Sequence, residues 1–351
     1  MGGTTSMWAD GQMPSSDLDP GPVQVADAKP AVAKAIVGRS PGQLAWMRLR
    51  RDRMAMVSLW VLVGFIAVAV LAPLVEIIYG YNALDQNSDL LDDQGLPLGY
   101  LGGITLSSDN PSHHMHIFGI QPGNGRDLFM QIVYGMRTSL LIASVATVFA
   151  TVLGVLVGIV AGYFGGWIDS LISWFVDYML AFPFFLFSLA VIPVINTRLA
   201  GPAGDVSAGK RIMTIIVVFS LFGWMYTARL VRGQVLSLRE REYVDAARAA
   251  GAPVRHILFR QLLPNLWAPV LITFSLGVPA TITAEGALSF LNIGVIEPTP
   301  DLGRLIENSS DFIFADPAYL LFPGITIFVL VLAFNLFGDS LRDALDPRSS
   351  R

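Results

Sequence analysis

The sequence predicts an all-α integral membrane protein with six transmembrane helices. Of its 351 residues, 53% are hydrophobic and only 14% are charged, and the mean hydropathy is +0.57. A soluble domain cannot cover that much apolar surface with so few charges. Six apolar segments also reach the length of about 20 residues that a helix needs to cross the hydrocarbon core. Helices are expected because a backbone exposed to lipid must satisfy its own hydrogen bonds.

The six expected spans lie within one transmembrane domain, 54–338, which also contains two long hydrophilic segments. The first is an extracellular loop, 76–138, and the second is a cytoplasmic loop, 233–265. Apolar stretches of sufficient length occur at 54–75, 139–162, 168–194, 212–231, 266–291 and 318–337.

The two ends of the chain read differently from the spans. Residues 1–40 are rich in Gly, Pro, Ser, Asp and Ala without apolar periodicity, which predicts a disordered cytoplasmic tail. Residues 41–53 mix Leu44, Trp46 and Met47 with arginines, which is typical of an amphipathic helix lying at the membrane interface. Residues 339–351 are expected to form a cytoplasmic C-terminal tail.

The distribution of basic residues predicts which loops are cytoplasmic. The chain contains 23 lysines and arginines, and most of them lie in the N-terminal region, in the loop between spans four and five, or near the C-terminus. Because basic loops stay on the cytoplasmic side, both termini and the second long loop are expected inside. The loop 76–138 is acidic and is expected outside.

The cytoplasmic segment 240–265, which we call the elbow, predicts two short helices joined at a bend. Ser237 and Glu240 have the spacing of a capping box, so a helix is expected to start there. Gly251 can close that helix in the left-handed conformation, and Pro253 suits the first turn of the next. In the second helix one apolar face is expected, with Pro264 ending it; that face comprises Val254, Ile257, Leu258, Gln261 and Leu262. An ordinary loop whose arginines set topology remains the alternative.

Several motifs in order resemble the C-type permease subunit of dipeptide, oligopeptide and nickel ABC importers. Asp245-Ala-Ala-x3-Gly251, followed by Leu263-Pro264, resembles the EAA loop of these permeases, with Asp245 in place of their glutamate. Further stretches that resemble the family cover about 41–348: Gly125-Arg-Asp127, Ala161-Gly-Tyr-Phe-Gly-Gly-Trp167, Ala181-Phe-Pro183, Ala228-Arg-Leu-Val-Arg-Gly-Gln-Val235, Ala287-Leu-Ser-Phe-Leu291, and the segment from Asn335 to Arg348.

The resemblance implies a type I ABC importer permease fold and a bent helix pair that docks on a cytoplasmic ATPase. It implies a bacterial inner-membrane protein forming half of a pathway for di- or oligopeptides, although nickel and glutathione importers share the architecture. Implied partners are a second permease subunit in a heterodimer, two ATPase subunits carrying ATP and magnesium, an extracellular binding protein and the lipid bilayer. The residues implied in coupling are Glu242, Asp245, Ala246, Ala247, Arg248, Gly251, Leu263 and Pro264.

Other classes of function find less support in the sequence. A secondary transporter or channel subunit that is not driven by ATP is the alternative, but no inverted repeat is evident. No catalytic constellation, cofactor motif or cysteine is present, so we expect no enzyme activity in this chain. The net charge of −4 gives no reason to expect nucleic-acid binding.

Ionisable residues within the spans are further candidates for function. Glu285, Ser289 and Asn292 recur on one helical face of span five and are candidates for the translocation pathway; a glutamate satisfied by a neighbour is the alternative. Asp169 and Asp177 lie nearer the inner end of span three, where they could either reach the membrane surface or pair with arginines. Gly154, Gly158 and Gly162 repeat every four residues in span two, which favours close helix packing.

Two apparent motifs are given less weight. His113, His114 and His116 lie close together in the extracellular loop, where imidazoles can bind transition metals but where incidental histidines are also common, so no metal site is assigned. Gly204 to Arg211 nearly spells a nucleotide-binding P-loop, but Arg211 replaces the hydroxyl residue that reaches magnesium. ATP is therefore expected on a partner chain.

Overall fold

The computed structural model describes residues 41–98, 102, 116–200 and 206–346, and no β-strand occurs within these ranges. Five helices are long and apolar enough to cross a membrane, and the number becomes six if a bent pair is counted as one span. The five are α2 (Arg53–Val70), α4 (Leu128–Phe164), α7 (Ala208–Leu238), α10 (Trp267–Phe290) and α12 (Pro317–Leu345). The expected tail 1–40 lies outside the described residues.

The third expected span, 168–194, is present as two helices with a sharp bend between them. Helix α5 (Gly166–Leu180) and helix α6 (Phe184–Leu199) meet at an angle of 82°. The break falls at Pro183, which has no backbone N–H and restricts the preceding residue to extended conformations. Helix α6 packs on α7, with the rings of Phe184 and Phe219 5.1 Å apart.

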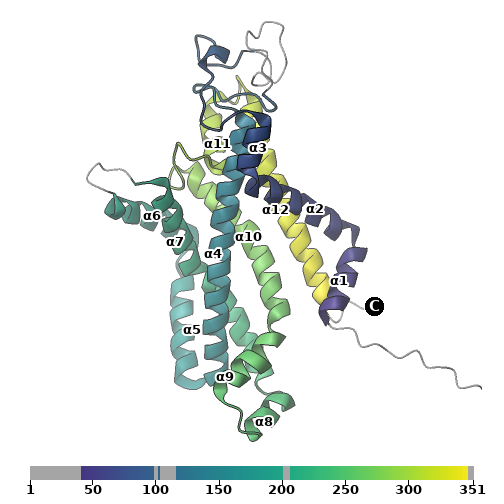
Figure 1. Ribbon diagram of the computed structural model, residues 1–351. Helices are drawn as coiled ribbons and strands as arrows, with labels where there is room; N and C mark the ends of the chain where they lie inside the picture. Colours follow the sequence, from purple (N-terminus) through teal and green to yellow (C-terminus); the bar gives the residue numbers. More distant parts are fainter. Residues whose placement is uncertain (1–40, 99–101, 103–115, 201–205, 347–351) are drawn as a thin grey trace, which may run out of the picture. The chain divides into compact units, whose positions relative to one another are not determined.

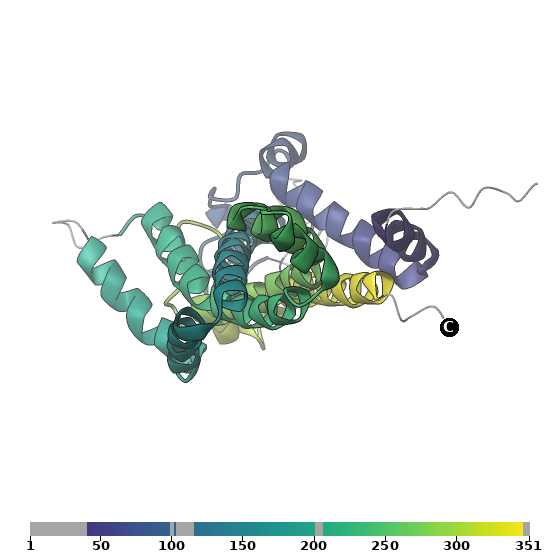
Figure 2. The same cartoon turned by 90° about the horizontal axis from the view of Figure 1, so that it is seen from below.

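The first span is also divided. Helix α2 ends at Val70, and α3 (Ala72–Tyr79) begins after Leu71 with a proline in its first turn. Before them, α1 (Pro41–Arg51) forms where an amphipathic helix was expected; its placement at a membrane surface stays a prediction. Leu49 of α1 and Ala55 of α2 pack on Ala344 near the end of α12, and α1 and α12 lie side by side in both views (Figures 1 and 2).

Helices α4 and α7 extend beyond the expected spans. Helix α4 begins at Leu128, well before position 139, because the side chain of Asp127 caps it by accepting the backbone N–H of Met130 at 2.7 Å. Helix α7 continues to Leu238, and Val235 within its last turns is fully buried. Ser237 therefore lies inside α7, so the predicted capping box does not form.

The glycine repeat of α4 brings its backbone against α7, as predicted. A Cβ at Gly154 would lie 2.5 Å from the Cβ of Thr227, and one at Gly162 would lie 2.7 Å from the Cβ of Val235. Such distances are shorter than real Cβ contacts, so only glycine permits this approach. We call Gly154, Gly158 and Gly162 the glycine stripe. It holds α4 tightly against α7, the helix that leads into the elbow.

The remaining helices surround this pair. Residues of α2, α4, α10 and α12 form the largest buried apolar cluster, together with the short helix α11 (Leu302–Ser309). A short 3₁₀ turn η5 (Ser310–Phe312) then leads towards α12. Helices α8 (Glu242–Ala249) and α9 (Val254–His256) lie at one end of the long helices, and α3 and α11 lie at the other (Figure 1). We call these the elbow end and the α11 end.

Candidate functional site

The elbow joins α7 to α10 through a chain of short helical pieces. Helix α8 is followed by α9, a π-helical turn η3 (Ile257–Leu262) and a 3₁₀ turn η4 (Leu263–Asn265). Gly251 lies between α8 and α9 with φ = +71°, the left-handed conformation predicted for it, and its N–H donates to the Arg248 carbonyl at 2.9 Å. The bend therefore depends on a backbone conformation that glycine adopts without strain.

One face of the elbow is anchored in the body of the protein. Val244 is fully buried in α8 and belongs to an apolar cluster with Val235 of α7 and Leu266 at the start of α10. The predicted inner face of the second helix is present at Ile257, Leu258 and Leu262, which join the same cluster. Val254 was also expected there but is 42% exposed, because it directly follows Pro253 at the bend.

The opposite face is open and chemically mixed. The predicted coupling residues Glu242, Asp245, Ala246, Arg248, Gly251 and Pro264 are exposed. Ala247 and Leu263 are half-buried and pack towards the apolar cluster. Tyr243 and Phe259 add exposed rings, 38% and 52% accessible. Exposed aromatic residues and arginines are enriched at protein-binding surfaces.

Arg248 links this face to α4. Its Nη1 donates to Asp245 Oδ1 at 3.2 Å, and its guanidinium lies 5.5 Å from the centre of the Tyr163 ring. Tyr163 is on the last turn of α4. A cation–π contact in this position steadies α8 against the long helices.

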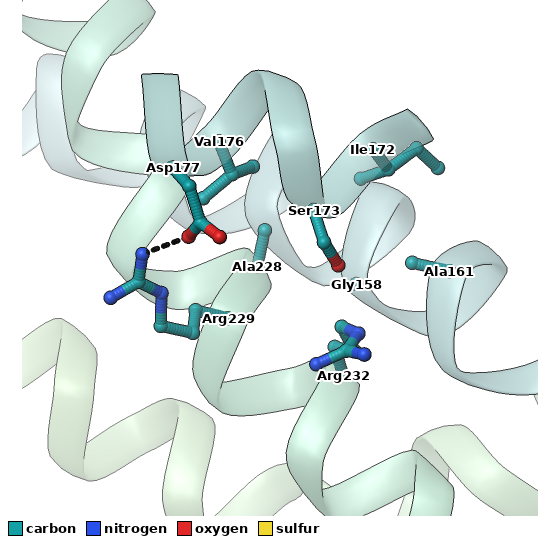
Figure 3. A pocket seen from close by; sticks show the side chains of 9 residues that line it. All are labelled: Gly158, Ala161, Ile172, Ser173, Val176, Asp177, Ala228, Arg229 and Arg232. Atoms are coloured by element: carbon teal, nitrogen blue, oxygen red, sulfur yellow. Dashed lines mark hydrogen bonds and ion pairs between the residues drawn. The ribbon is translucent and has the colours of Figure 1, made fainter. Parts of the chain in front are cut away.

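A cavity of about 250 Å³ lies between α4, α5 and α7 (Figure 3). Asp177 of α5 pairs with Arg229 of α7 across it, as the dashed line in Figure 3 shows. Asp169 accepts from Arg232, with Arg232 Nη2 2.8 Å from Asp169 Oδ2. Of the two alternatives left open by the sequence, both aspartates therefore adopt pairing with arginines, and these pairs tie the first half of the broken span to α7.

The structure separates the three predicted pathway residues. Glu285 and Ser289 are fully buried, and the Ser289 hydroxyl donates to Glu285 Oε1 at 3.0 Å. Asn292 lies beyond the end of α10 with φ = +62°, and its side-chain amide donates to Glu307 at 3.0 Å. In this conformation Glu285 faces protein, and its role in a pathway stays a prediction.

Sequence reasoning missed the residue that lies against Glu285. Asp301 caps α11 by accepting the backbone N–H of Arg304 at 2.9 Å, and it is only 1% exposed. It lies within hydrogen-bonding distance of Glu285. The sequence indicates that Asp301 can cap a helix that begins at Leu302. It does not indicate that this aspartate, which follows Pro300, is buried.

The one described residue of the histidine cluster has a structural contact. His113 and His114 lie outside the described residues. His116 Nδ1 lies 2.7 Å from Asp127 Oδ2, which also accepts from the Tyr79 hydroxyl at 3.0 Å. Among the residues that the structure describes, no group of three or more His, Asp or Glu side chains is arranged to hold a metal ion.

Comparison with known proteins agrees with this architecture. Residues 154–351 match the family model described as binding-protein-dependent transport system inner membrane component, and residues 40–95 match the N-terminal TM domain of oligopeptide transport permease C. A crystal form of the MetNI methionine ABC transporter, in inward-facing conformations, aligns with a TM-score of 0.50 at 19% identity. That alignment covers 62% of this chain and 98% of the other, and it supports the permease fold.

Curated relatives are similar over nearly their whole length. The dipeptide transport system permease protein DppC of Alkalihalophilus pseudofirmus is 36% identical, covering 88% of this chain and 90% of the relative. The oligopeptide transport system permease protein OppC of Escherichia coli K12 is 34% identical, covering 89% and 93%. The glutathione transport system permease protein GsiD of Shigella flexneri is 34% identical, covering 92% and 96%. The chain therefore belongs to the family of binding-protein-dependent transport system inner membrane components, as a multi-pass permease subunit of an ABC importer.

Proposed function

We propose that this chain forms one half of the translocation pathway of an ATP-driven importer for di- or oligopeptides. The observation that carries the proposal is the elbow, which is anchored to α7 and α10 on one face and open on the other. The names of two of the relatives support peptides as the substrate class. No observation favours a secondary transporter or a channel.

In this proposal a groove on a cytoplasmic ATPase holds the exposed face of α8. Glu242, Asp245 and Arg248 supply polar contacts, while Ala246 and Gly251 allow close approach because their side chains are small or absent. Ala247, Leu263 and Pro264 shape the bend and its return to the membrane.

The elbow then transmits motion to the spans. ATP binding draws two ATPase subunits together, and the groove moves with them. Because Val244 belongs to one buried apolar cluster with Val235 of α7 and Leu266 at the start of α10, displacement of α8 shifts the inner ends of both helices. The ATPases supply the energy, and this chain supplies contacts that differ between the inward-open and outward-open states.

The remaining partners follow from the same scheme. A second permease chain completes the pathway in a heterodimer, and an extracellular binding protein delivers the substrate to the α11 end. ATP and magnesium bind the ATPase subunits, and both termini of this chain face the cytoplasm.

Thiol labelling tests the contact and the orientation together. The chain contains no cysteine, so Ala249→Cys would carry the only thiol, on the exposed face of α8. We expect this thiol to cross-link to an ATPase subunit in the assembled transporter and to resist a membrane-impermeant maleimide added to intact cells. Asp85→Cys, exposed near the α11 end, is the control and should show the opposite behaviour. Labelling of Ala249→Cys from outside would refute the orientation.

Uptake assays test the substrate class. Cells carrying the complete transporter should accumulate labelled di- or tetrapeptides, and unlabelled peptides should compete better than glutathione or nickel. Uptake of glutathione or nickel alone would refute the peptide assignment while leaving the elbow's role intact.

A further inference from the structure

Two acidic side chains are buried together where α4, α10 and α11 meet. Glu285 of α10 is 0% exposed and Asp301, at the start of α11, is 1% exposed. Their carboxyl groups interact, and the backbones beside them touch: a Cβ at Gly303 would lie 2.2 Å from the Gly286 carbonyl oxygen. Two carboxylates cannot both remain ionised in contact and out of water, because the charges repel and each loses its hydration.

The hydrogen bonds around the pair leave one oxygen on each carboxyl group without a donor. Glu285 Oε1 accepts from Ser289, and Asp301 Oδ1 accepts from the Arg304 backbone. Glu285 Oε2 and Asp301 Oδ2 are buried and receive no hydrogen bond of ordinary geometry within the described part of the chain. Ser139 of α4 contributes a third buried oxygen, Oγ, beside Glu285.

No basic side chain neutralises the pair. Among the described residues, neither carboxyl group forms an ion pair. Arg304, the nearest basic residue along the chain, turns its side chain towards Asn292 and Glu307 instead. The groups facing the pair are therefore the serine hydroxyls of α4 and α10.

The number of free oxygens decides what can bridge the two carboxyl groups. A calcium ion takes six to eight oxygen ligands and a magnesium ion takes six, whereas the described part of the chain offers three unpaired side-chain oxygens here. A proton needs only two. Burial also raises the pKa of the Asp301 carboxyl, although hydrogen bonds from Glu285 and from the Arg304 backbone oppose this rise.

We propose that Glu285 and Asp301 bind one proton between them and that this proton bridge holds α11 against α4 and α10. Close backbone packing supports the second part: a Cβ at Gly303 of α11 would lie 2.2 Å from the Gly286 carbonyl oxygen of α10. A Cβ at Gly135 of α4 would lie 3.2 Å from the Asp301 carbonyl carbon. The proton belongs to the pair rather than to either residue.

Infrared spectroscopy of the purified, assembled transporter at neutral pH tests the proposal. Wild type should show the carbonyl stretch of a protonated carboxyl group, shifted in heavy water. Glu285→Gln and Asp301→Asn should each remove that band, because an amide N–H then donates to the remaining carboxylate. Glu307→Gln, also on α11, is the matched control and should leave the band unchanged. If one of the two variants cannot be purified, the infrared band of the other is enough to test the proposal. An unchanged band in a purified variant overturns the proposal.

The pH dependence of unfolding gives a second readout. Since burial raises the pKa of Asp301 in the folded protein, the proton at this position stabilises the protein most at low pH. This contribution falls as the pH rises from the ordinary carboxyl range of about 4 through the raised pKa of Asp301. The melting temperature of wild type should therefore fall relative to Glu285→Gln as the pH rises. Parallel profiles, or specific protection of wild type by calcium or sodium, would overturn the proton bridge. Neither readout depends on the transported substrate.

Discussion

Gly158 of α4 lies directly against the backbone of Ala228 in α7: a Cβ at Gly158 would lie 2.6 Å from the Ala228 carbonyl oxygen. The two helices are thus joined backbone to backbone along the stripe that leads to the elbow. In the proposed mechanism, a displacement of the elbow moves α4 and α7 as one unit, because neither can slide without breaking this packing.

Gly158→Ala should therefore destabilise the protein. The added methyl group forces the helices apart, and overpacking of this kind costs about 1–3 kcal/mol. Gly233→Ala in α7 is the control, because a Cβ there meets nothing within 4 Å and alanine favours a helix. Melting temperatures of the purified complex should fall for the first variant and hold or rise for the second. Equal melting temperatures would show that the stripe is not tightly packed.

Gly251 tests the bend of the elbow. Its φ of +71° strains any L-residue, by roughly 1–2 kcal/mol, although a Cβ would have open space. We expect Gly251→Val to abolish uptake, Gly251→Ala to reduce it several-fold, and Gly251→Asn to be the mildest, with the protein still in the membrane. Gly80→Val meets a similar strain at φ +86° at the α11 end and should reduce uptake less. Normal uptake by Gly251→Val would count heavily against the coupling role.

A substitution at Val244 tests the buried side of α8 rather than its exposed docking face. Val244→Ala removes buried methyl groups and should cost about 1–3 kcal/mol of local stability, while the exposed Glu242 and Asp245 are untouched. The expected result is ATP hydrolysis that continues with weakened peptide uptake. Gly233→Ala in α7, where a Cβ meets nothing within 4 Å, lies outside the docking face and should retain coupling. Proportional loss of hydrolysis and uptake in Val244→Ala would instead indicate failed assembly.

Asp52 makes a pH-dependent contact between α2 and α12, two helices that are far apart in the sequence. Its side chain caps α2 and accepts the Ser340 hydroxyl of α12 at 2.8 Å. The hydrogen bond from Ser340 lowers the pKa of Asp52. A lowered pKa means that the contribution to stability is present above the ordinary aspartate value of about 3.9 and is lost as the pH falls through the folded-state value.

Ser340→Ala should remove that contribution. The difference in melting temperature between wild type and Ser340→Ala should be small, because Asp52 is only half-buried, and it should be constant at neutral pH. It should shrink as the pH falls below about 4. A difference that stays constant into strongly acidic solution would exclude ionised Asp52 as the acceptor.

Local signals explain which elements were predictable. The glycine repeat of α4, the left-handed Gly251 and the arginine partners of Asp169 and Asp177 were readable because each depends on spacing or on the needs of one residue type. The break at Pro183 was not anticipated, because the apolar run continues across it and hydropathy does not register a lost backbone donor. The same limit applies to Ser237. Its spacing to Glu240 matches a capping box, but α7 continues past Ser237 because Val235 is buried in the protein interior.

The sequence by itself determined the membrane class, the approximate spans and the bent elbow, since these depend on composition, on apolar length and on the backbone freedom of glycine and proline. Only the tertiary structure decided that Glu285 meets Asp301, that Val244 anchors α8 and that the third span bends by 82°. Such contacts join segments distant in the chain, and their energies arise from burial and packing that no single segment encodes.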